Sequence, residues 1–573
     1  MIAADHIAIA LEKQGVTHVY ELVGGMITFM LDALHRRGQI EVVSMHHEQG
    51  AGFAAEGHAR MHGLPAVAFA TSGPGATNLL TAIGSCHFDS VPVVFITGQV
   101  NRHEQRGARA IRQLGFQETD IVAMAQPITK AAWLVNDPAD LPKMIERAFE
   151  LAQAGRPGPV LIDIPMDVQR AEVPEAAAPN PPAQATLPAE AQAFLGRMNE
   201  ALVNSARPLI IAGGGCAPPN MRTLFRHFAD CAGIPVVHSL MGVDLLPAAH
   251  PLRIGLLGSY GNRWANMAVA QADLLIVLGS RLDVRQTGAD TAGFVAGKKV
   301  FHVDVEAGEI NNRVSGCDAL VAELGAFLPA AAERIRAPRA GVAQWLTEIA
   351  ANRAKWPDTA ELAGIQGINP NRFIQALSAC PQDPAAFVAD VGQHQMWAAQ
   401  SLRLGENQRF LTSGGMGAMG FALPAAIGAC FGAGRRPVVV VAGDGGFQLN
   451  IQELQTIVRN RLPLKMVVLN NGCHGMVRQF QESYFKSRFQ STVWGYSAPD
   501  FSKVAAAYGI SSMRIALESE IESGLQALWA CPSEPHLLEV MIAPDTNVYP
   551  KMAFGKPISE MEPFAKPTEM EGT

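Results

Sequence analysis

Two polar residues, Asp444 and Asn471, could hold a divalent cation between them. Asp444 follows the aliphatic run of residues 438–442, and Asn471 ends a second apolar run that starts at Leu464. Mg²⁺ takes six oxygen ligands and is usually bound by one or two protein side chains together with phosphate oxygens. A main-chain carbonyl just beyond Asn471, that of Cys473, would complete the protein ligands. The sequence therefore predicts a Mg²⁺ site that also receives a phosphate group.

The segment that joins these residues is typical of a strand–helix–strand unit. Residues 438–442 predict a buried strand, residues 451–458 carry apolar side chains at helical spacing, and residues 464–470 predict the neighbouring strand. A right-handed crossover brings the two polar residues to the same carboxyl edge of a parallel sheet, where α/β proteins bind ligands. The turn, and a helix expected to start near Phe447, would offer N–H groups to an anion. The glycines of this turn are Gly443, Gly445 and Gly446.

An ordinary surface turn is the competing interpretation of the Gly-Asp-Gly sequence. Such turns are common, because glycine and aspartate both favour tight backbone bends. The two asparagines at residues 470 and 471 favour the metal site instead. A buried strand that ends in two amide side chains gains little structurally, whereas a metal ligand at that position has to be polar.

The chain around this unit alternates between apolar runs and amphipathic stretches, which predicts an α/β fold with three doubly wound parallel-sheet domains. At 573 residues it is too long for one hydrophobic core. A Pro- and Ala-rich stretch predicts a linker after the first domain. The predicted parts are an N-terminal domain at 1–167, a linker at 168–187, a central domain at 188–338, a helical connector at 339–368, a third domain at 369–545 and a tail at 546–573.

Composition excludes several classes of protein. Hydrophobic residues make up 48% of the chain and charged residues 17%, which favours a folded protein over a disordered one. The net charge is -7 without a long basic run, so neither nucleic acid nor an anionic membrane is an expected partner. No apolar run approaches the length of about 20 residues that spans a bilayer. The eight cysteines show no Cys-x-x-Cys pair, which is typical of reduced thiols, and we expect a cytoplasmic protein.

The segment from Gly443 to Asn471 resembles the thiamine diphosphate signature, which opens with Gly-Asp-Gly and closes with Asn-Asn. Nearly the whole chain resembles the acetolactate synthase (acetohydroxyacid synthase) large-subunit branch of the thiamine diphosphate-dependent enzymes. The resemblance implies three α/β domains, called pyrimidine-binding, central and diphosphate-binding, with thiamine diphosphate and Mg²⁺ as cofactors. The collinear segments that carry it are residues 47–60, 70–80, 89–100, 116–122, 155–165, 391–400 and 412–429.

The resemblance also implies roles for individual residues. Glu48 corresponds to the glutamate that pairs with the aminopyrimidine ring nitrogen of the cofactor and starts its proton chemistry. Met419 corresponds to the apolar residue that holds the two cofactor rings in a bent conformation, and Gly417 to the carbonyl that binds the pyrimidine amine. The other corresponding positions are Gly25 and Gln117 beside the 2-oxo acid, Gln393 and His394 at the diphosphate, and Met476 among the cofactor-binding residues.

The resemblance further implies an oligomer and a flavin. In this family the glutamate and the diphosphate site come from different chains, so we expect a homodimer or homotetramer with active sites at the subunit interface. The central domain of acetolactate synthases carries FAD that takes no part in net redox chemistry. Residues 256–262 depart from the family's Met-His pattern in this domain. The positions that match flavin contacts are Gly213, Gly214, Gly215, Leu240, Gly279, Arg281, Arg285 and Asp304.

The activity implied is that of a carboligase that decarboxylates pyruvate, or a similar 2-oxo acid, and transfers the acyl anion to a second carbonyl. The acceptor pocket departs from the branched-chain synthases, because Phe480 replaces a tryptophan and Met166 a lysine. Residues 101–116 add a loop that we expect near the active-site entrance. A keto-sugar or another ketone or aldehyde is therefore an alternative acceptor. A 2-oxo acid decarboxylase or oxidase, and a catalytically inactive cofactor-binding relic, are further alternatives.

Overall fold

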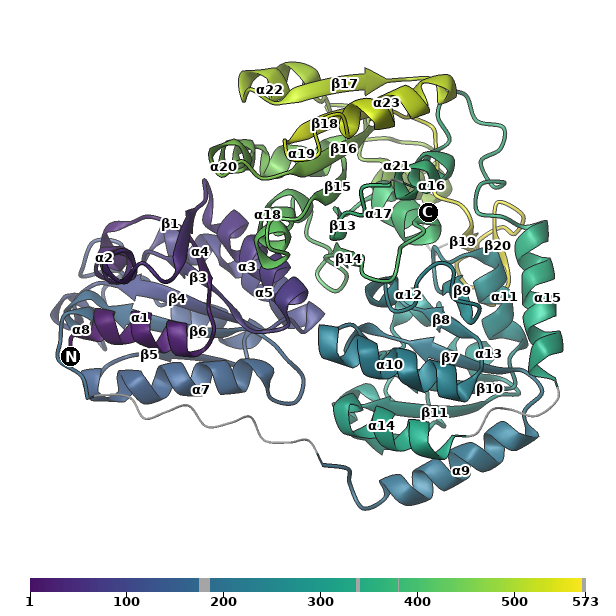
Figure 1. Ribbon diagram of the computed structural model, residues 1–573, viewed down its shortest axis with the longest axis horizontal. Coiled ribbons are helices and arrows are strands. Elements are labelled where there is room, and N and C mark those ends of the chain that lie inside the picture. The colour runs from purple at the N-terminus through teal and green to yellow at the C-terminus, as the bar shows by residue number, and fades with distance from the viewer. Residues whose placement is uncertain (175–185, 336–340, 380, 569–573) are drawn as a thin grey trace.

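The computed structural model describes residues 1–174, 186–335, 341–379 and 381–568. Three α/β domains are arranged around one another, with the N-terminal domain on the left, the central domain at the lower right and the third domain at the top of Figure 1. Each contains one six-stranded parallel sheet with helices packed on its faces. The predicted fold class is confirmed. Most of the predicted linker, residues 175–185, lies outside the described residues.

The sheet of the N-terminal domain has the strand order β2-β1-β3-β4-β6-β5, and all of its pairs are parallel. Its inner strands are buried on both sides, as their continuous apolar sequences predict. The strands are β1 (His18–Leu22), β2 (Glu41–Ser44), β3 (Ala66–Ala70), β4 (Val93–Gln99), β5 (Ala131–Leu134) and β6 (Val160–Pro165). The helices are α1 (Ala3–Lys13), α2 (Thr28–Arg37), α3 (Glu48–His62), α4 (Pro74–Asn78), α5 (Leu80–Asp89), α6 (Ile121–Ala125), α7 (Leu141–Gln153) and α8 (Met166–Gln169).

The third domain repeats this topology, with the order β14-β13-β15-β16-β18-β17. When its strands are renumbered from one to six, the two orders are identical. The strands are β13 (Ala386–Ala389), β14 (Arg409–Thr412), β15 (Val438–Gly443), β16 (Leu464–Asn470), β17 (Ser511–Ile515) and β18 (His536–Met541). The helices are α16 (Pro370–Ser378), α17 (Gln393–Ser401), α18 (Ala422–Gly432), α19 (Asp444–Leu449), α20 (Leu454–Arg459), α21 (Gly475–Tyr484), α22 (Phe501–Ala507) and α23 (Ile521–Leu528).

The central domain has a different order, β12-β11-β10-β7-β8-β9. All of its strands are parallel, but the strand order runs outward in opposite directions from β7 and from β10. Doubly wound folds of this order bind nucleotides at the point between two such strands. The strands are β7 (Pro208–Ala212), β8 (Val236–His238), β9 (Arg253–Leu256), β10 (Leu274–Leu278), β11 (Lys299–Asp304) and β12 (Asp318–Val321). The helices are α9 (Ala191–Asn204), α10 (Pro219–Ala232), α11 (Arg263–Gln271), α12 (Val284–Thr287), α13 (Thr291–Val295), α14 (Leu324–Arg334) and α15 (Val342–Lys355).

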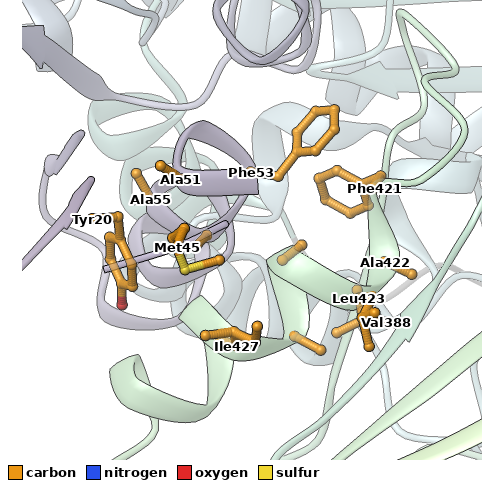
Figure 2. Close-up of a cluster of buried hydrophobic side chains, with 14 of the residues drawn as sticks. Tyr20, Met45, Ala51, Phe53, Ala55, Val388, Phe421, Ala422, Leu423 and Ile427 are labelled. Atoms are coloured by element: carbon orange, nitrogen blue, oxygen red, sulfur yellow. The ribbon is translucent and has the colours of Figure 1, made fainter. Parts of the chain in front are cut away.

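The first and third domains share one hydrophobic core through α3 and α18. Phe53 of α3 faces Phe421, which directly precedes α18, with ring centroids 5.4 Å apart (Figure 2). Glycines let the two helices come unusually close. A Cβ on Gly428 would lie 1.7 Å from the Ala54 carbonyl oxygen, and a Cβ on Gly57 would lie 2.0 Å from that of Ala425. Only the missing side chains allow this approach.

The segment predicted as a tail is ordered over residues 546–568. It forms a small antiparallel sheet, β19 (Lys551–Met552) with β20 (Met561–Glu562), and buries apolar side chains against the central domain. The Met552 N–H donates to the Ser259 carbonyl oxygen at 2.7 Å. This segment therefore ties the third domain to the central one. Within the described residues, no helix is both long and apolar enough to cross a membrane.

Candidate active site

The structure places Asp444 and Asn471 at the ends of adjacent parallel strands. Strands β15 and β16 pair directly, and Asp444 and Asn471 each follow the last residue of their strand. The helix expected near Phe447 starts earlier, at Asp444, and stops at Leu449. Asn450 interrupts it, because its backbone leaves the helical region and its side chain donates to the Gly420 carbonyl oxygen at 2.8 Å. The helix after the glycine turn is therefore short, and it begins directly at Asp444.

Three oxygen atoms meet at this point. The Asn471 side-chain oxygen lies 2.9 Å from the Cys473 carbonyl oxygen and 3.2 Å from Oδ1 of Asp444. None of these atoms carries a hydrogen when Asp444 is ionised, so their proximity is unfavourable without a positive charge between them. Oxygens on adjacent corners of a Mg²⁺ octahedron, each about 2.1 Å from the ion, are about 3.0 Å apart. The observed spacing fits such a cation.

The orientation of the Asn471 amide follows from its other neighbours. Asn471 Nδ2 donates to Gln393 Oε1 at 2.9 Å, and Gln393 Nε2 donates to the Thr546 carbonyl oxygen at 2.9 Å. Because Thr546 offers only an acceptor there, the Gln393 amide is fixed, and the Asn471 amide is fixed in turn. The Asn471 oxygen is therefore directed at Asp444. Gln393, predicted to contact the diphosphate, has its amide engaged with these two residues.

Tyr496 holds the second oxygen of Asp444. Its hydroxyl donates to Asp444 Oδ2 at 2.7 Å, and its ring packs on His474 with centroids 4.4 Å apart. Asp444 is 1% exposed, and burial raises the pKa of its carboxyl to about 6, while the Tyr496 hydrogen bond acts to lower it. The phenol thus occupies one carboxylate oxygen and leaves Oδ1 facing Asn471.

His394 offers an unused polar atom beside the glycine turn. Its Nε2 is buried and has no hydrogen-bond partner among the described residues. A Cβ on Gly443 would lie 2.7 Å from His394 Nδ1, so this glycine leaves room for the imidazole. Burial lowers the pKa of His394 to about 3, which leaves the ring neutral at pH 7. A neutral imidazole with a free nitrogen fits the edge of a phosphate-binding site, as does the small glycine turn.

The loop of residues 413–420, which includes Gly417 and Met419, is held at both ends by buried carboxylates. Asp89 accepts hydrogen bonds from the N–H groups of Gly414 and Gly415 at 2.9 and 2.6 Å. Asp390 accepts from the N–H groups of Gly420 and Ala422 at 3.0 and 2.9 Å. Gly417 has a φ of +67°, a conformation that favours glycine, and Met419 is half-buried.

Asp89 belongs to the N-terminal domain and the loop of residues 413–420 to the third domain, so the conformation of this loop depends on contacts between the two domains. The Arg60 guanidinium lies 2.9 Å from Asp89 and 3.0 Å from Glu56, and Arg60 also donates to the Thr412 carbonyl oxygen at 2.7 Å. Burial raises the pKa of Glu56 to about 7, which the positive charge of Arg60 counteracts. The arginine thereby joins the N-terminal domain to the strand end from which the loop starts.

Glu48, Gly25 and Gln117 form a second group, in the N-terminal domain. Glu48 begins α3, is 6% exposed, and accepts a hydrogen bond from Asn78 Nδ2 at 2.9 Å. Gln117 has a φ of +66°, and its carbonyl oxygen accepts from the Ser72 hydroxyl at 2.7 Å. Gly25 starts a short turn at the end of β1 and has open space beside it. Glu48 and Gln117 contact the segment of residues 71–78, and the residues on either side of Gly25 lie against Thr71 of the same segment.

The remaining predicted residues lie at the edges of these groups. Phe480 is on α21, is 42% exposed and packs on Tyr484, with ring centroids 4.9 Å apart. Met476 lies one turn earlier on the same helix and is half-buried. Met166 begins α8 at the carboxyl end of β6, in the N-terminal domain. The structure describes one chain, so the predicted pairing of Glu48 with a partner's Asp444 stays a prediction.

The predicted flavin residues lie mainly around the carboxyl ends of β7 and β10, where the strand order of the central sheet reverses. The loops after β7 and β10 touch, since a Cβ on Gly213 would lie 2.1 Å from the Gly279 carbonyl oxygen. Arg281 lies 3.5 Å from Asp283 and remains about one-third exposed. Buried Asp304 ends β11. The other members of this set are Gly214 and Gly215 after β7, Leu240 after β8, and Arg285 in α12.

Sequence reasoning missed Tyr496, Asp89 and Asp390. Tyr496 stands 25 residues beyond Asn471 in an irregular segment, and nothing in its neighbourhood signals a contact with Asp444. Asp390 directly follows β13 and is a signal that could have been used, because polar residues at the carboxyl ends of parallel strands face the ligand edge. Asp89 acts across a domain boundary, which no local pattern reveals.

Comparison with known proteins agrees with this geometry. Three family profiles match consecutive parts of the chain: the N-terminal TPP binding domain of thiamine pyrophosphate enzymes over residues 1–124, their central domain over residues 195–331, and their C-terminal TPP binding domain over residues 390–540. The chain belongs to the thiamine pyrophosphate enzyme family. Thiamine pyrophosphate is another name for thiamine diphosphate, the cofactor implied by the resemblance described above.

Relatives of this thiamine pyrophosphate enzyme include several acetolactate synthases. It is 39% identical to acetolactate synthase isozyme 1 large subunit of Escherichia coli (strain K12), over 97% of each chain. It is 37% identical to the acetolactate synthase large subunit of Lactococcus lactis subsp. lactis (strain IL1403), over 96% of this chain and 94% of the relative. It is 38% identical to chloroplastic acetolactate synthase 2 of Nicotiana tabacum, over 96% of this chain and 84% of the relative. The enzyme belongs to their branch of the family.

Proposed function

We propose that this enzyme is an acetolactate synthase-like carboligase that decarboxylates pyruvate and joins the resulting acyl unit to a second carbonyl compound. The cluster of three oxygens from Asp444, Asn471 and Cys473 is the observation that carries the proposal, because it supplies the protein ligands of a diphosphate-bound Mg²⁺. The family and the relatives support it independently. Thiamine diphosphate, when bound, supplies the electron sink that stabilises the carbanion formed on loss of CO₂.

The residues of the chain would bind and orient this cofactor. Asp444, Asn471 and the Cys473 carbonyl would hold the cation, and the Nε2-protonated tautomer of His394 would donate a hydrogen bond to the diphosphate. The loop held by Asp89 and Asp390 would offer the Gly417 carbonyl and the Met419 side chain to the pyrimidine ring. Holding reacting groups in a fixed geometry contributes strongly to catalysis.

Glu48 would exchange a proton with the ring nitrogen of the aminopyrimidine. Its position at the start of a buried helix, with Asn78 orienting the carboxylate, fits a fixed proton donor and acceptor. We further propose that Glu48 acts on a cofactor held by the Asp444 of a second subunit. The minimal active assembly would then be a homodimer, which sedimentation of the purified enzyme would test.

The decisive test of the activity is incubation of the purified protein with pyruvate, Mg²⁺ and thiamine diphosphate. We expect release of CO₂ and formation of 2-acetolactate, both detectable by mass spectrometry. Bound cofactor without release of CO₂ would refute pyruvate as the donor. Accumulation of aldehyde or acetyl phosphate would instead identify a decarboxylase or an oxidase. An inactive relic would bind the cofactor and turn over no 2-oxo acid.

The acceptor need not be a second pyruvate, and one observation favours a bulkier carbonyl compound. Phe480 is 42% exposed, and Phe116 at the end of the additional loop is 81% exposed, so apolar surface is available near residues predicted to border the substrate. A ketone or aldehyde with a larger apolar body would cover it, whereas a keto-sugar, the other alternative acceptor, presents mainly hydroxyl groups. Product analysis over a panel of carbonyl acceptors distinguishes the two possibilities, because the preferred acceptor gives the highest kcat/KM.

We also propose FAD in the central domain. The crevice between the Gly213–Gly215 and Gly279 loops is the position at which sheets of this strand order bind dinucleotides. The glycines bring the two loops into backbone contact, so a diphosphate could approach the main chain. The absorbance spectrum of the purified enzyme tests this: a flavin band near 450 nm is expected, and its absence after reconstitution with FAD would refute the assignment.

A further inference from the structure

A cavity of about 380 Å³ lies between the central domain and the third domain. Its walls come from the start of β9, the start of α11, the end of α15, and helices α16 and α17. None of its lining residues belongs to the candidate active site or to the proposed flavin crevice. Its volume falls within the usual range for sites that bind small molecules, about 300 to 1,000 Å³.

Arg253, at the start of β9, is the unusual member of this cavity. Its side chain is half-buried, its Nε is buried without a hydrogen-bond partner, and it forms no ion pair with any residue that the structure describes. Burial and the nearby positive charge of Arg353 lower its pKa to about 10, although Asp358 opposes this effect. The guanidinium is therefore still charged at neutral pH. A partly buried charge without a partner is stabilised when an anion neutralises it.

Two further arginines line the same cavity, and each is held in place by a neighbour. The Arg353 guanidinium stacks 5.4 Å from the centre of the Trp264 ring, and Arg403 donates to Gln375 Oε1 at 3.1 Å. Preorganised guanidinium groups lose little freedom when they bind a ligand.

Asp358 is the one carboxylate among the lining residues, and it is already engaged. It accepts from the Ser401 hydroxyl at 2.6 Å and from Gln375 Nε2 at 2.9 and 3.0 Å. Three guanidinium groups against one carboxylate leave the cavity with a formal charge of about +2. This excess of positive charge matches a doubly charged anion.

We infer that this cavity is a binding site for a small molecule that carries a phosphate group. Guanidinium groups bind phosphate oxygens through paired, charge-assisted hydrogen bonds, and a phosphate dianion balances the formal charge. The cavity is larger than a free phosphate needs, so a phosphate ester also fits. Inorganic phosphate and a phosphate ester share this chemistry, so the test compares them.

Isothermal titration calorimetry on the holoenzyme tests the inference. The protein is first saturated with thiamine diphosphate, Mg²⁺ and FAD, so that the cofactor sites cannot take up the probes. Inorganic phosphate and glucose 6-phosphate are then titrated separately. Saturable binding of either probe, with one site per chain, supports the inference, and the tighter probe identifies the source of the phosphate. Absence of binding of both at millimolar concentration overturns it.

Arg253→Met provides the discriminating variant. It should weaken phosphate binding at least tenfold, and without phosphate its Tm should equal or exceed that of the natural enzyme, because an unpaired charge has been removed. A merely structural arginine would give a lower Tm and unchanged phosphate binding, and this result overturns the inference.

A second variant, Arg353→Met, changes an exposed residue whose loss does not threaten folding. It should also weaken phosphate binding, and unchanged phosphate binding in that variant counts against the site. Arg334→Met, on α14 outside the cavity, is the matched control and should bind phosphate normally.

Discussion

The close packing of α3 against α18 makes Gly428 an informative position to substitute. A Cβ at residue 428 would lie 1.7 Å from the Ala54 carbonyl oxygen, whereas contacts under 3.0 Å are essentially never observed. The two helices would have to separate by at least the difference, 1.3 Å. The Ala54 oxygen is a backbone atom and the backbone fixes where the Cβ lies, so no side-chain rotation can relieve the contact. We therefore expect Gly428→Ala to destabilise the enzyme.

The size of the effect follows from two opposing terms. Overpacking a well-packed core costs about 1 to 3 kcal/mol, and this site belongs at the upper end because backbone atoms collide. Replacing glycine by alanine inside a helix contributes about 1 kcal/mol in the favourable direction. The expected net loss is about 2 kcal/mol. Activity should fall more steeply, by about 100-fold, because α3 begins with Glu48 and α18 follows the Met419 loop.

Calorimetry and a steady-state assay measure the two effects. Gly196→Ala is a matched control, because Gly196 lies in α9 and has no atom within 4 Å of its added Cβ. That variant should be as stable as the natural enzyme or slightly more stable, with full activity. If Gly428→Ala were to behave like Gly196→Ala, the packing described between the first and third domains would be wrong.

Three further predictions concern the candidate site and its support. Glu48→Gln should lose activity by at least about 100-fold while thiamine diphosphate still quenches tryptophan fluorescence; retained activity would remove Glu48 from the proton chemistry. Tyr496→Phe frees Asp444 Oδ2, and since Ca²⁺ accepts bidentate carboxylates more readily than Mg²⁺, the ratio of Ca²⁺ to Mg²⁺ affinity should rise about tenfold. An equal loss of both affinities would indicate a purely structural tyrosine, and Tyr508→Phe is the control. Burial raises the pKa of Asp163 to about 7. Between about pH 4 and pH 7 the native state therefore keeps a proton that the unfolded chain has lost, and the free energy of unfolding falls as the pH rises through this range. Asp163→Asn should therefore gain stability relative to the natural enzyme at pH 8 but not at pH 4, by on the order of 2 kcal/mol, and a pH-independent difference in chemical denaturation would contradict this.

Local pattern predicted the parts of the site that lie within one strand–helix–strand unit. The positions of Asp444 and Asn471 follow from two apolar strands and the handedness of their connection, which are properties of the sequence itself. The helix after Asp444 was predicted to start near Phe447 but starts at Asp444, and it ends at Leu449 because Asn450 contacts Gly420 in a distant loop. The helix propensities of the local sequence cannot predict such a long-range contact.

Interactions between domains could not be predicted in this way. The Asp89 bonds to Gly414 and Gly415 join residues more than 300 positions apart, and they form only once the N-terminal and third domains have come together. The segment after Asp545 looked like a tail because it is short and rich in turn residues. Its burial depends on the surface offered by the central domain.

The position of Thr546 late in the chain has a consequence for when the arrangement around Asn471 can form during synthesis. The Thr546 carbonyl fixes Gln393, which in turn directs the Asn471 oxygen toward the cation position. A ribosome adds Thr546 after every other residue of that arrangement and after the last strand of the third sheet, so a growing chain can complete the proposed cation site only near the end of its synthesis. Incomplete chains would then leave metal and cofactor to finished molecules.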